Sequence, residues 1–415
     1  MSLRHPIAVF ILMVLAMSMI WSKALLSIGM GFLAIIAAVD IRINPFRIRW
    51  VLTPGTVSKT LRSHSALWVF SLFCFLYVIS ILYAGNVSEW WRFTHPKLAF
   101  LLLPLSMVMT GPFTKKDYML IMACMILMTV WGALCVLLAY YDNYYIFTRS
   151  IGFGGSLPSP TNHIRFGTTV AACMIMCLFF AIENWKLKYN WERWAYGGIA
   201  VFLFWFLHIL AVRSGLAVGY AGIGVLILFY VRRLKGSLQL LLLLVVLMAP
   251  FIAFKLSPAF ELKIRYTLYD LEQFRKGEGD EYSDSQRWIS WQAGLDIGKR
   301  HPLLGAGTGQ FQKELDAYYA LHQKDFNWRP QNQWINVFAI FGIMGLLVFS
   351  FVIFYPMTFA SFWKPALFPT LYLVQLLTLL FEHPLDSEMG TMLFLVLTLL
   401  GQSIQLQKPS PIPET

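Results

Sequence analysis

The stretch WAYGGIAVFLFWFLHILAVRSGLAVGYAGIGVLILFYV, residues 194–231, contains one side chain that is always charged, Arg213, close to its middle. A single helix of this length would extend about 57 Å, which is nearly twice the hydrocarbon thickness of a bilayer. Two antiparallel helices joined by a tight turn at residues 212–215 fit a bilayer better. The stretch therefore predicts an integral membrane protein in which Arg213 lies at the turn between two helices.

The composition of the whole chain agrees with this prediction. Of 415 residues, 58% are hydrophobic and 13% are charged, whereas soluble domains carry about 25% charged residues. Twelve apolar runs have about the length of a transmembrane helix. These runs are residues 6–22, 24–39, 66–84, 97–111, 118–140, 165–183, 194–212, 214–231, 237–254, 334–355, 366–382 and 389–406. We therefore predict an all-α integral membrane protein with about 12 transmembrane helices.

Lysine and arginine predict the side of each loop, because they are enriched in short cytoplasmic loops. With both chain ends inside, the inner segments carry 16 of these residues and the short outer segments carry six. The one long loop, residues 255–333, then lies on the outer side of the membrane. The net charge of +12 comes mostly from cytoplasmic anchors. It is therefore no sign of nucleic-acid binding, which needs a basic patch that follows a phosphate backbone.

The long loop divides the chain into parts with different expected roles. Residues 1–254 would form nine transmembrane helices, residues 255–333 an outer helical module, residues 334–407 three further transmembrane helices, and residues 408–415 a disordered tail. Within the module, residues 258–276, 286–299 and 310–322 are predicted helices. Asp284 or Ser285 would cap the second of them. The glycine-rich stretch GAGTGQF, residues 305–311, is predicted to be a tight turn, because it lacks the residues of a nucleotide-binding loop.

Two arginines are candidates for binding an anion on the outer side. Arg213 lies in a short outer turn, where positive charge is disfavoured, and arginines at membrane depth often mark functional sites. The alternative is a side chain that only reaches to the interface. Arg287 is predicted in the first turn of a helix, where it opposes the helix dipole by roughly 0.3–1 kcal/mol. An arginine beside free N–H groups at that turn would form an anion site.

Other candidates lie in predicted outer segments. Arg149 and Arg165 either extend a basic rim or anchor their helices. The stretch FEHPLDSEMG, residues 381–390, brings Glu382 and His383 close together, which suits proton transfer, although a solvated turn is the commoner case. Trp291 packs against the membrane domain or offers a platform for a sugar. No spacing of histidine, cysteine, aspartate and glutamate makes a convincing metal site.

Four motifs together resemble one family. They are AVRSGLA at residues 211–217, SQRWISWQAGLDIGKRHPLLGAGTGQF at residues 285–311, PQNQWINVFAIFGIMGLL at residues 330–347 and FEHPLDSEMGTMLF at residues 381–394. In their order, spacing and sidedness they resemble the O-antigen ligase and polymerase family of bacterial membrane glycosyltransferases. Each motif alone is degenerate, and the combination carries the resemblance.

The resemblance implies a GT-C-like membrane fold and an enzyme that uses an undecaprenyl-diphosphate-linked glycan as its donor. The acceptor would be the lipid A–core of lipopolysaccharide for a ligase, or another glycan for a polymerase. Transfer would take place on the periplasmic face of the bacterial inner membrane, among membrane lipids. Arg213 and Arg287 would bind the diphosphate. Neither a metal nor another cofactor is expected, since the donor is already activated.

One position departs from the family pattern, which has His-Asn where this chain has Gln331-Asn332. Glutamine can orient an acceptor hydroxyl but cannot remove its proton. We expect Gln331 and Asn332 to line the acceptor cavity. His322, Glu382 or His383 would then accept the proton. Alternatively, the reaction hardly needs a base, because the arginines hold the departing diphosphate.

A transporter or flippase of lipid-linked glycans is the alternative from another functional class. Transporters tend to have internal repeats and broken helices with a site near the middle of the membrane. In this sequence, the unusual charges gather on one side, beside a long loop that transport would not need. The sequence therefore favours glycosyl transfer.

Overall fold

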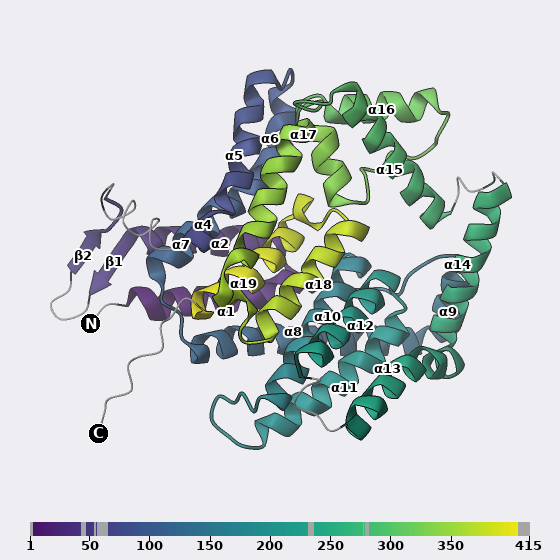
Figure 1. Ribbon diagram of the computed structural model, residues 1–415, viewed down its shortest axis with the longest axis horizontal. Coiled ribbons are helices and arrows are strands. Elements are labelled where there is room, and N and C mark those ends of the chain that lie inside the picture. Colours follow the sequence, from purple (N-terminus) through teal and green to yellow (C-terminus); the bar gives the residue numbers. More distant parts are fainter. Residues whose placement is uncertain are drawn as a thin grey trace.

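Helices form nearly all of the computed structural model, which describes residues 3–42, 47–53, 55, 65–230, 236–276, 278 and 282–405. Figure 1 shows the N-terminal helices at one end of the molecule and helices α14 to α16 at the other. The helices before the long loop are α1 (Arg4–Trp21), α2 (Lys23–Ala38), α4 (Ser65–Trp68), α5 (Ser71–Ile79), η1 (Ser80–Tyr83), α6 (Val87–Thr94), η2 (His95–Leu98), α7 (Ala99–Thr110), α8 (Lys115–Asp142), α9 (Tyr144–Gly152), α10 (His163–Ile182), α11 (Glu192–Leu210), α12 (Arg213–Tyr230) and α13 (Gly236–Leu256).

The remaining helices belong to the long loop and to the C-terminal part. They are α14 (Pro258–Lys276), α15 (Ser283–Arg300), α16 (Phe311–Leu321), α17 (Gln333–Phe354), η4 (Tyr355–Thr358), η5 (Ala360–Trp363), α18 (Leu367–Phe381), η6 (Pro384–Asp386) and α19 (Glu388–Gln405). One short antiparallel hairpin, which the sequence did not predict, pairs β1 (Val39–Arg42) with β2 (Arg47–Trp50). Apart from this hairpin, the fold is all-α as predicted.

The predicted membrane spans correspond to apolar helices of two lengths. Within the described part of the chain, seven helical segments have the length and composition to cross a membrane, and five apolar helices are shorter. These twelve segments match the twelve predicted runs in order. The shorter segments are Lys23–Ala38, Ser71–Tyr83, Leu247–Leu256, Leu367–Phe381 and Glu388–Ile404. Two of them are parts of longer helices, α13 with 21 residues and α19 with 18. The predicted runs therefore correspond to helices that differ in length, for example 15 residues in α18, 16 in α2 and 28 in α8.

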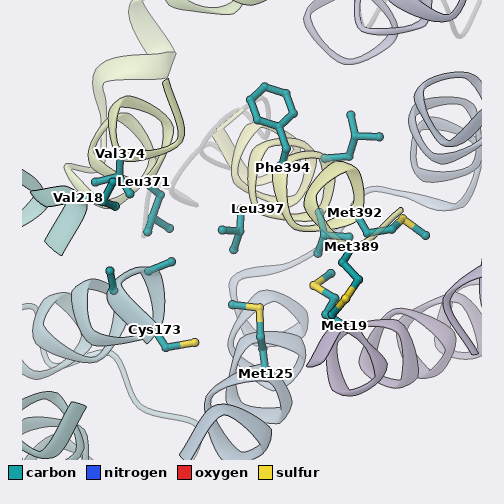
Figure 2. Packing of buried hydrophobic residues seen from close by; sticks show 14 of the residues in the cluster. Met19, Met125, Cys173, Val218, Leu371, Val374, Met389, Met392, Phe394 and Leu397 are labelled. Atoms are coloured by element: carbon teal, nitrogen blue, oxygen red, sulfur yellow. The ribbon is translucent and has the colours of Figure 1, made fainter. Parts of the chain in front are cut away.

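Buried side chains from the N-terminal half and from the C-terminal helices form the core together. Figure 2 shows Met125 of α8, Cys173 of α10, Leu371 of α18 and Leu397 of α19 around one shared space. Helices α10 and α12 pack closely against each other. A Cβ atom added to Gly215 of α12 would lie only 2.9 Å from the backbone of α10. Small residues at such contacts let membrane helices pack against one another. This packing sets where the α11–α12 turn lies.

The long loop is helical, and one of its helices, α15, begins at a different residue than predicted. Helix α14 has the predicted bounds, and α16 begins one residue later and ends one residue earlier than predicted. Helix α15 begins at Ser283, three residues before the predicted start, and neither Asp284 nor Ser285 caps it. The main-chain N–H of Asp284 and the hydroxyl of Ser285 instead donate to the carboxylate of Asp270, each at 2.9 Å. The division of the chain into domains stays a prediction, and the predicted tail lies outside the described residues.

Helix α17 is broken at Gly342, which has a φ of 61° and a ψ of −157°. The loop after α15 fills the break with main-chain hydrogen bonds in both directions. Ala306 donates to the carbonyl of Ala339 at 3.0 Å, and Ile343 donates to the carbonyl of Pro302 at 2.8 Å. The prediction of a tight turn in GAGTGQF is confirmed, since two of its glycines have positive φ. The turn therefore replaces the hydrogen bonds that the broken helix lacks.

Candidate functional site

A cavity of about 550 Å³ lies where the helices of the long loop meet the ends of the apolar helices. Its walls come from the segment between α9 and α10, the α11–α12 turn, α14, α15, the segment before α17 and the turn between α18 and α19. Six of the ten predicted site residues line it: Arg165, Arg213, Arg287, Gln331, Glu382 and His383. Residues far apart in the sequence are thus brought to one place.

Arg213 is held at the start of α12 by hydrogen bonds to the long loop. Helix α11 ends at Leu210, and Ala211 takes a left-handed conformation with a φ of 52°, which makes the turn tight as predicted. The guanidinium of Arg213 donates to the hydroxyl of Thr267 at 3.0 Å and forms an ion pair with Asp284. The side chain remains one-third exposed. It is therefore anchored and still accessible from the cavity.

Arg287 lies on the other side of the same carboxylate. Its Nη1 atom is 4.0 Å from Oδ1 of Asp284, and its Nε atom is buried without a hydrogen-bond partner in the described structure. Burial lowers the pKa of Arg287, while Glu382 and Asp284 act in the opposite direction. The two arginines thus flank Asp284 and face one cavity.

The predicted anion site at the start of α15 is corrected by the structure. Because α15 begins at Ser283, Arg287 lies beyond the first turn. The carboxylate of Asp270, which has no exposed surface, already accepts hydrogen bonds from the N-terminal residues of this helix. The helix terminus is therefore occupied by the protein itself. Any anion in the cavity would bind to side chains.

The turn between α18 and α19 contributes Glu382 and His383 to the cavity wall. Glu382 is 5% exposed, and burial raises its pKa, while Arg165 and Arg287 partly offset that effect. Burial lowers the pKa of His383 to about 4, so this imidazole is neutral at pH 7. Its Nδ1 atom is buried and has no hydrogen-bond partner among the described residues. The wall thus holds two groups able to exchange a proton.

A buried ion pair fixes this turn to two other elements. Nζ of Lys97 in η2 lies 2.7 Å from Oδ1 of Asp386, and both side chains are at most 4% exposed. Asn336 of α17 donates to Oδ2 of Asp386 at 2.6 Å, and the side chain of Gln333 accepts from the main chain of Leu385 at 3.1 Å. Burial alone would raise the pKa of Asp386, but Lys97, His383 and Arg329 outweigh it and hold that pKa far below its usual value.

The sequence predicts no role for this ion pair, since neither Lys97 nor Asp386 is among the predicted site residues. One signal was available, because Lys97 stands at the start of an apolar run, where an isolated lysine needs a partner. The identity of that partner depends on a turn far away in the sequence.

Four predicted site residues do not line the cavity. Asn332 caps α17, since its Oδ1 atom accepts from the main chain of Trp334 at 2.9 Å, and its amide donates to the carbonyl of Leu380 at 3.0 Å. The expectation that Asn332 lines the cavity is corrected accordingly. His322 stacks on a tyrosine ring with the centroids 4.1 Å apart. The other two are Trp291, which packs against Trp288, and Arg149 in α9.

The cavity also contains cations that the sequence analysis did not single out. Lys263 of α14 and Arg329 before α17 line it. Among all the lining residues, five side chains carry a guanidinium or an ammonium group, and Glu382 carries the one carboxylate. Such an excess of positive charge favours an anionic ligand. No group of three or more histidine, cysteine, aspartate or glutamate side chains is arranged for a metal ion in the part of the chain described.

The structure also contains an apolar cavity of about 680 Å³. Its lining comes from α8, α11, α13 and the start of α14, with aromatic and aliphatic side chains such as Tyr140, Trp205 and Met248. Ile209 of α11 lines this second cavity, whereas its neighbour Leu210 lines the cationic one. The two cavities therefore both have walls on α11 and α14.

Comparison with known proteins connects this geometry to one family. The family model described as O-antigen ligase matches residues 198–350, which include Arg213, Arg287 and Gln331. A search among curated proteins gave no match. The matched range extends from α11 to α17 and contains the whole long loop. The resemblance predicted from the sequence is thereby confirmed for residues 198–350, which match the O-antigen ligase family.

Proposed function

We propose that the protein is a membrane glycosyltransferase that moves a glycan from a polyprenyl diphosphate to an acceptor hydroxyl on the periplasmic face of the inner membrane. Lipid A–core is the proposed acceptor, which makes the protein an O-antigen ligase. The observation that carries this proposal is the cationic cavity in which Arg213 and Arg287 flank one carboxylate. The apolar cavity, which like the cationic one has walls on α11 and α14, supports it, because a prenyl chain needs an apolar site.

The proposed reaction replaces one bond to the anomeric carbon by another. The acceptor oxygen attacks this carbon, and the bond to the diphosphate oxygen breaks with its electron pair moving to the diphosphate. Negative charge therefore grows on the leaving group, and preorganised guanidinium groups stabilise such charge. In the absence of the donor, Asp284 forms ion pairs with Arg213 and Arg287. When the donor is bound, its phosphate oxygens replace some of these contacts to the two arginines.

The acceptor proton needs a base that reaches the cavity. Of the three predicted candidates, His322 does not line the cavity, whereas Glu382 and His383 do. Basicity increases with pKa. The pKa of Glu382 is raised above 4.5, whereas that of His383 is about 4. We therefore assign Glu382 as the proposed base and Gln331 as the residue that orients the acceptor hydroxyl.

The proposal is tested with purified protein, an undecaprenyl-diphosphate-linked glycan and lipid A–core. We expect Arg287→Ala to lower the rate of glycan transfer by roughly 100-fold or more, as loss of one charge-stabilising group does in other enzymes. Arg300→Ala is the matched control, because Arg300 is on the same helix but pairs with Asp296 and Glu314 at the surface. Unchanged transfer by the Arg287 variant contradicts the proposal.

A polymerase is the second candidate, and the departure at Gln331 favours it, since the acceptor part of the site differs from the family pattern. The same assay separates the two activities. Supplied with the lipid-linked glycan alone, a polymerase makes longer lipid-linked products. A ligase makes product only when lipid A–core is added.

A further inference from the structure

Lys263 reaches the cationic cavity from α14 and holds the segment after α9. Its ammonium donates to the carbonyl of Gly154 at 2.9 Å and to that of Gly155 at 3.1 Å. A Cβ atom added to Gly154 would lie 2.5 Å from the ring of Tyr266, so this segment packs directly on α14. An ammonium group has three N–H donors, of which these carbonyls take two. One donor remains for the cavity that Lys263 lines.

The charged groups around Lys263 come from several elements. Arg213 of α12 disfavours its charged form, whereas Asp284 of α15 and Asp270 of α14 itself favour it. His163 at the start of α10 shares the cavity lining with Lys263. A ligand that neutralises Arg213 would therefore also make the ammonium more favourable.

We propose that Lys263 is a third cationic ligand of the donor diphosphate, beside Arg213 and Arg287. The proposal rests on the proposed function, because the ligand is the same diphosphate. Two arginines and one lysine then surround the phosphates from three different helices, α12, α14 and α15. The lysine also links the ligand to Gly154 and Gly155, so the segment after α9 is held against the occupied site.

Binding of the donor should be coupled to a proton. Burial lowers the pKa of Lys263 to about 8, so about half of the free protein carries a neutral amine at pH 8. A bound diphosphate raises that pKa, because a nearby anion favours the ammonium. Binding at pH 8 therefore takes up part of a proton. At pH 6 the amine is already protonated, so Lys263 takes up none.

The experiment is calorimetry of the detergent-solubilised full chain with a short-chain prenyl-diphosphate N-acetylglucosamine. This diphosphate is a diester, so it has no proton of its own to exchange near pH 8. Titrations in two buffers with different ionisation enthalpies give the protons taken up. We expect uptake at pH 8 to exceed uptake at pH 6 in the unmodified protein. Lys263→Met should bind the probe about tenfold more weakly or worse, as loss of a hydrogen bond to a charged group does.

Two further variants distinguish the effect of the positive charge from that of proton uptake and from that of misfolding. Lys263→Arg keeps a permanent positive charge, so it should bind nearly as well as the unmodified protein and lose the extra uptake at pH 8. Any uptake it retains belongs to other lining groups, namely His163, His383 and Glu382. Lys276→Met, on the exposed part of the same helix, is the matched control and should behave as the unmodified protein does. If Lys263→Met does not fold, the arginine variant decides alone.

Three results would overturn the inference. Equal affinity of Lys263→Met and Lys276→Met excludes a contact between Lys263 and the diphosphate. Equal proton uptake by Lys263→Arg and the unmodified protein excludes the lysine as the group that is protonated. Absence of probe binding by the unmodified protein overturns the proposed function together with the inference, whereas binding without the lysine effects overturns the inference alone.

Discussion

Glu382 and Gln331 face the same cavity from different elements, and their roles can be separated. If Glu382 accepts the acceptor proton, Glu382→Gln should lower kcat by roughly 100-fold or more. The rate of the unmodified protein should fall as the pH falls through the pKa of Glu382, because only the carboxylate is a base. Since this pKa is raised, the fall begins at a higher pH than for an ordinary glutamate. The measurement is kcat against pH.

A second substitution provides the control for that experiment. Gln331→His introduces the residue that the family pattern has, and a histidine with an ordinary pKa near 6.5 is a competent base. We expect Gln331→His to restore part of the activity of Glu382→Gln, with a pH profile that rises near 6.5. A Glu382→Gln variant with undiminished kcat would contradict the role of Glu382 as base.

Single residues also show where sequence reasoning was sufficient for the site and where it was not. Arg213 was predictable because it places charge in a short outer turn. Arg287 was singled out by a predicted place in the first turn of a helix, which the structure corrects, although the residue does line the cavity. Lys263 breaks no rule. It is one of many charged residues in a long loop, and only the packing of α14 brings it to the cavity. The catalytic and binding roles of all these residues stay predictions.

At the scale of elements, the ion pair between η2 and the turn before α19 should stabilise the fold only while it is complete. Lys97→Met leaves the buried carboxylate of Asp386 without its cation, which should lower the free energy of unfolding by about 3–5 kcal/mol. The double variant Lys97→Met/Asp386→Leu should recover most of that loss, since no charge remains unpaired. The measurement is thermal unfolding in detergent. Equal destabilisation of the single and double variants would contradict this account.

The break in α17 gives a second prediction at this scale. Gly342→Ala should prevent correct folding, because its φ and ψ are almost restricted to glycine and a Cβ atom there would lie 2.5 Å from the backbone of Leu303. Gly224→Ala is the control, since no atom lies within 4 Å of the added methyl group. That change in a helix should be neutral or stabilise by about 0.5–1 kcal/mol. Yield of monodisperse protein and its unfolding temperature test both variants.

Element boundaries followed from the sequence where local rules acted alone. Helix α14 has its predicted bounds, and the turn at Arg213 is where the apolar pattern required it. The start of α15 was missed because Asp270, on the preceding helix, supplies the acceptor that a capping side chain normally provides. The break in α17 was missed because its hydrogen bonds come from a loop about 40 residues earlier in the chain. Tertiary contacts decided both cases.

At the scale of the whole molecule, the convergence of distant segments was predicted through the family resemblance. Composition and periodicity indicated the membrane helices, and the four motifs indicated which loops belong together. No local pattern specifies that the α9–α10 segment and α14 complete the cavity, because their contact depends on how the helices pack. The break in α17 is filled by the chain itself, and no residue of α17 lines the basic cavity. This differs from a transporter, in which a broken helix lines the substrate path.

Helix α18, which leads into the turn with Glu382 and His383, has 15 residues and is therefore shorter than a full bilayer crossing of about 20 residues. A hydrophobic stretch shorter than the bilayer makes the surrounding bilayer thinner, so that it meets the helix ends. The same protein reconstituted in phosphatidylcholines of increasing acyl length should therefore transfer glycan fastest in thin membranes. Identical rates from short-chain to long-chain lipids would contradict this expectation. Where the bilayer is thin, the distance between the headgroup layer and the arginines would be shorter for the phosphates of a lipid-linked sugar.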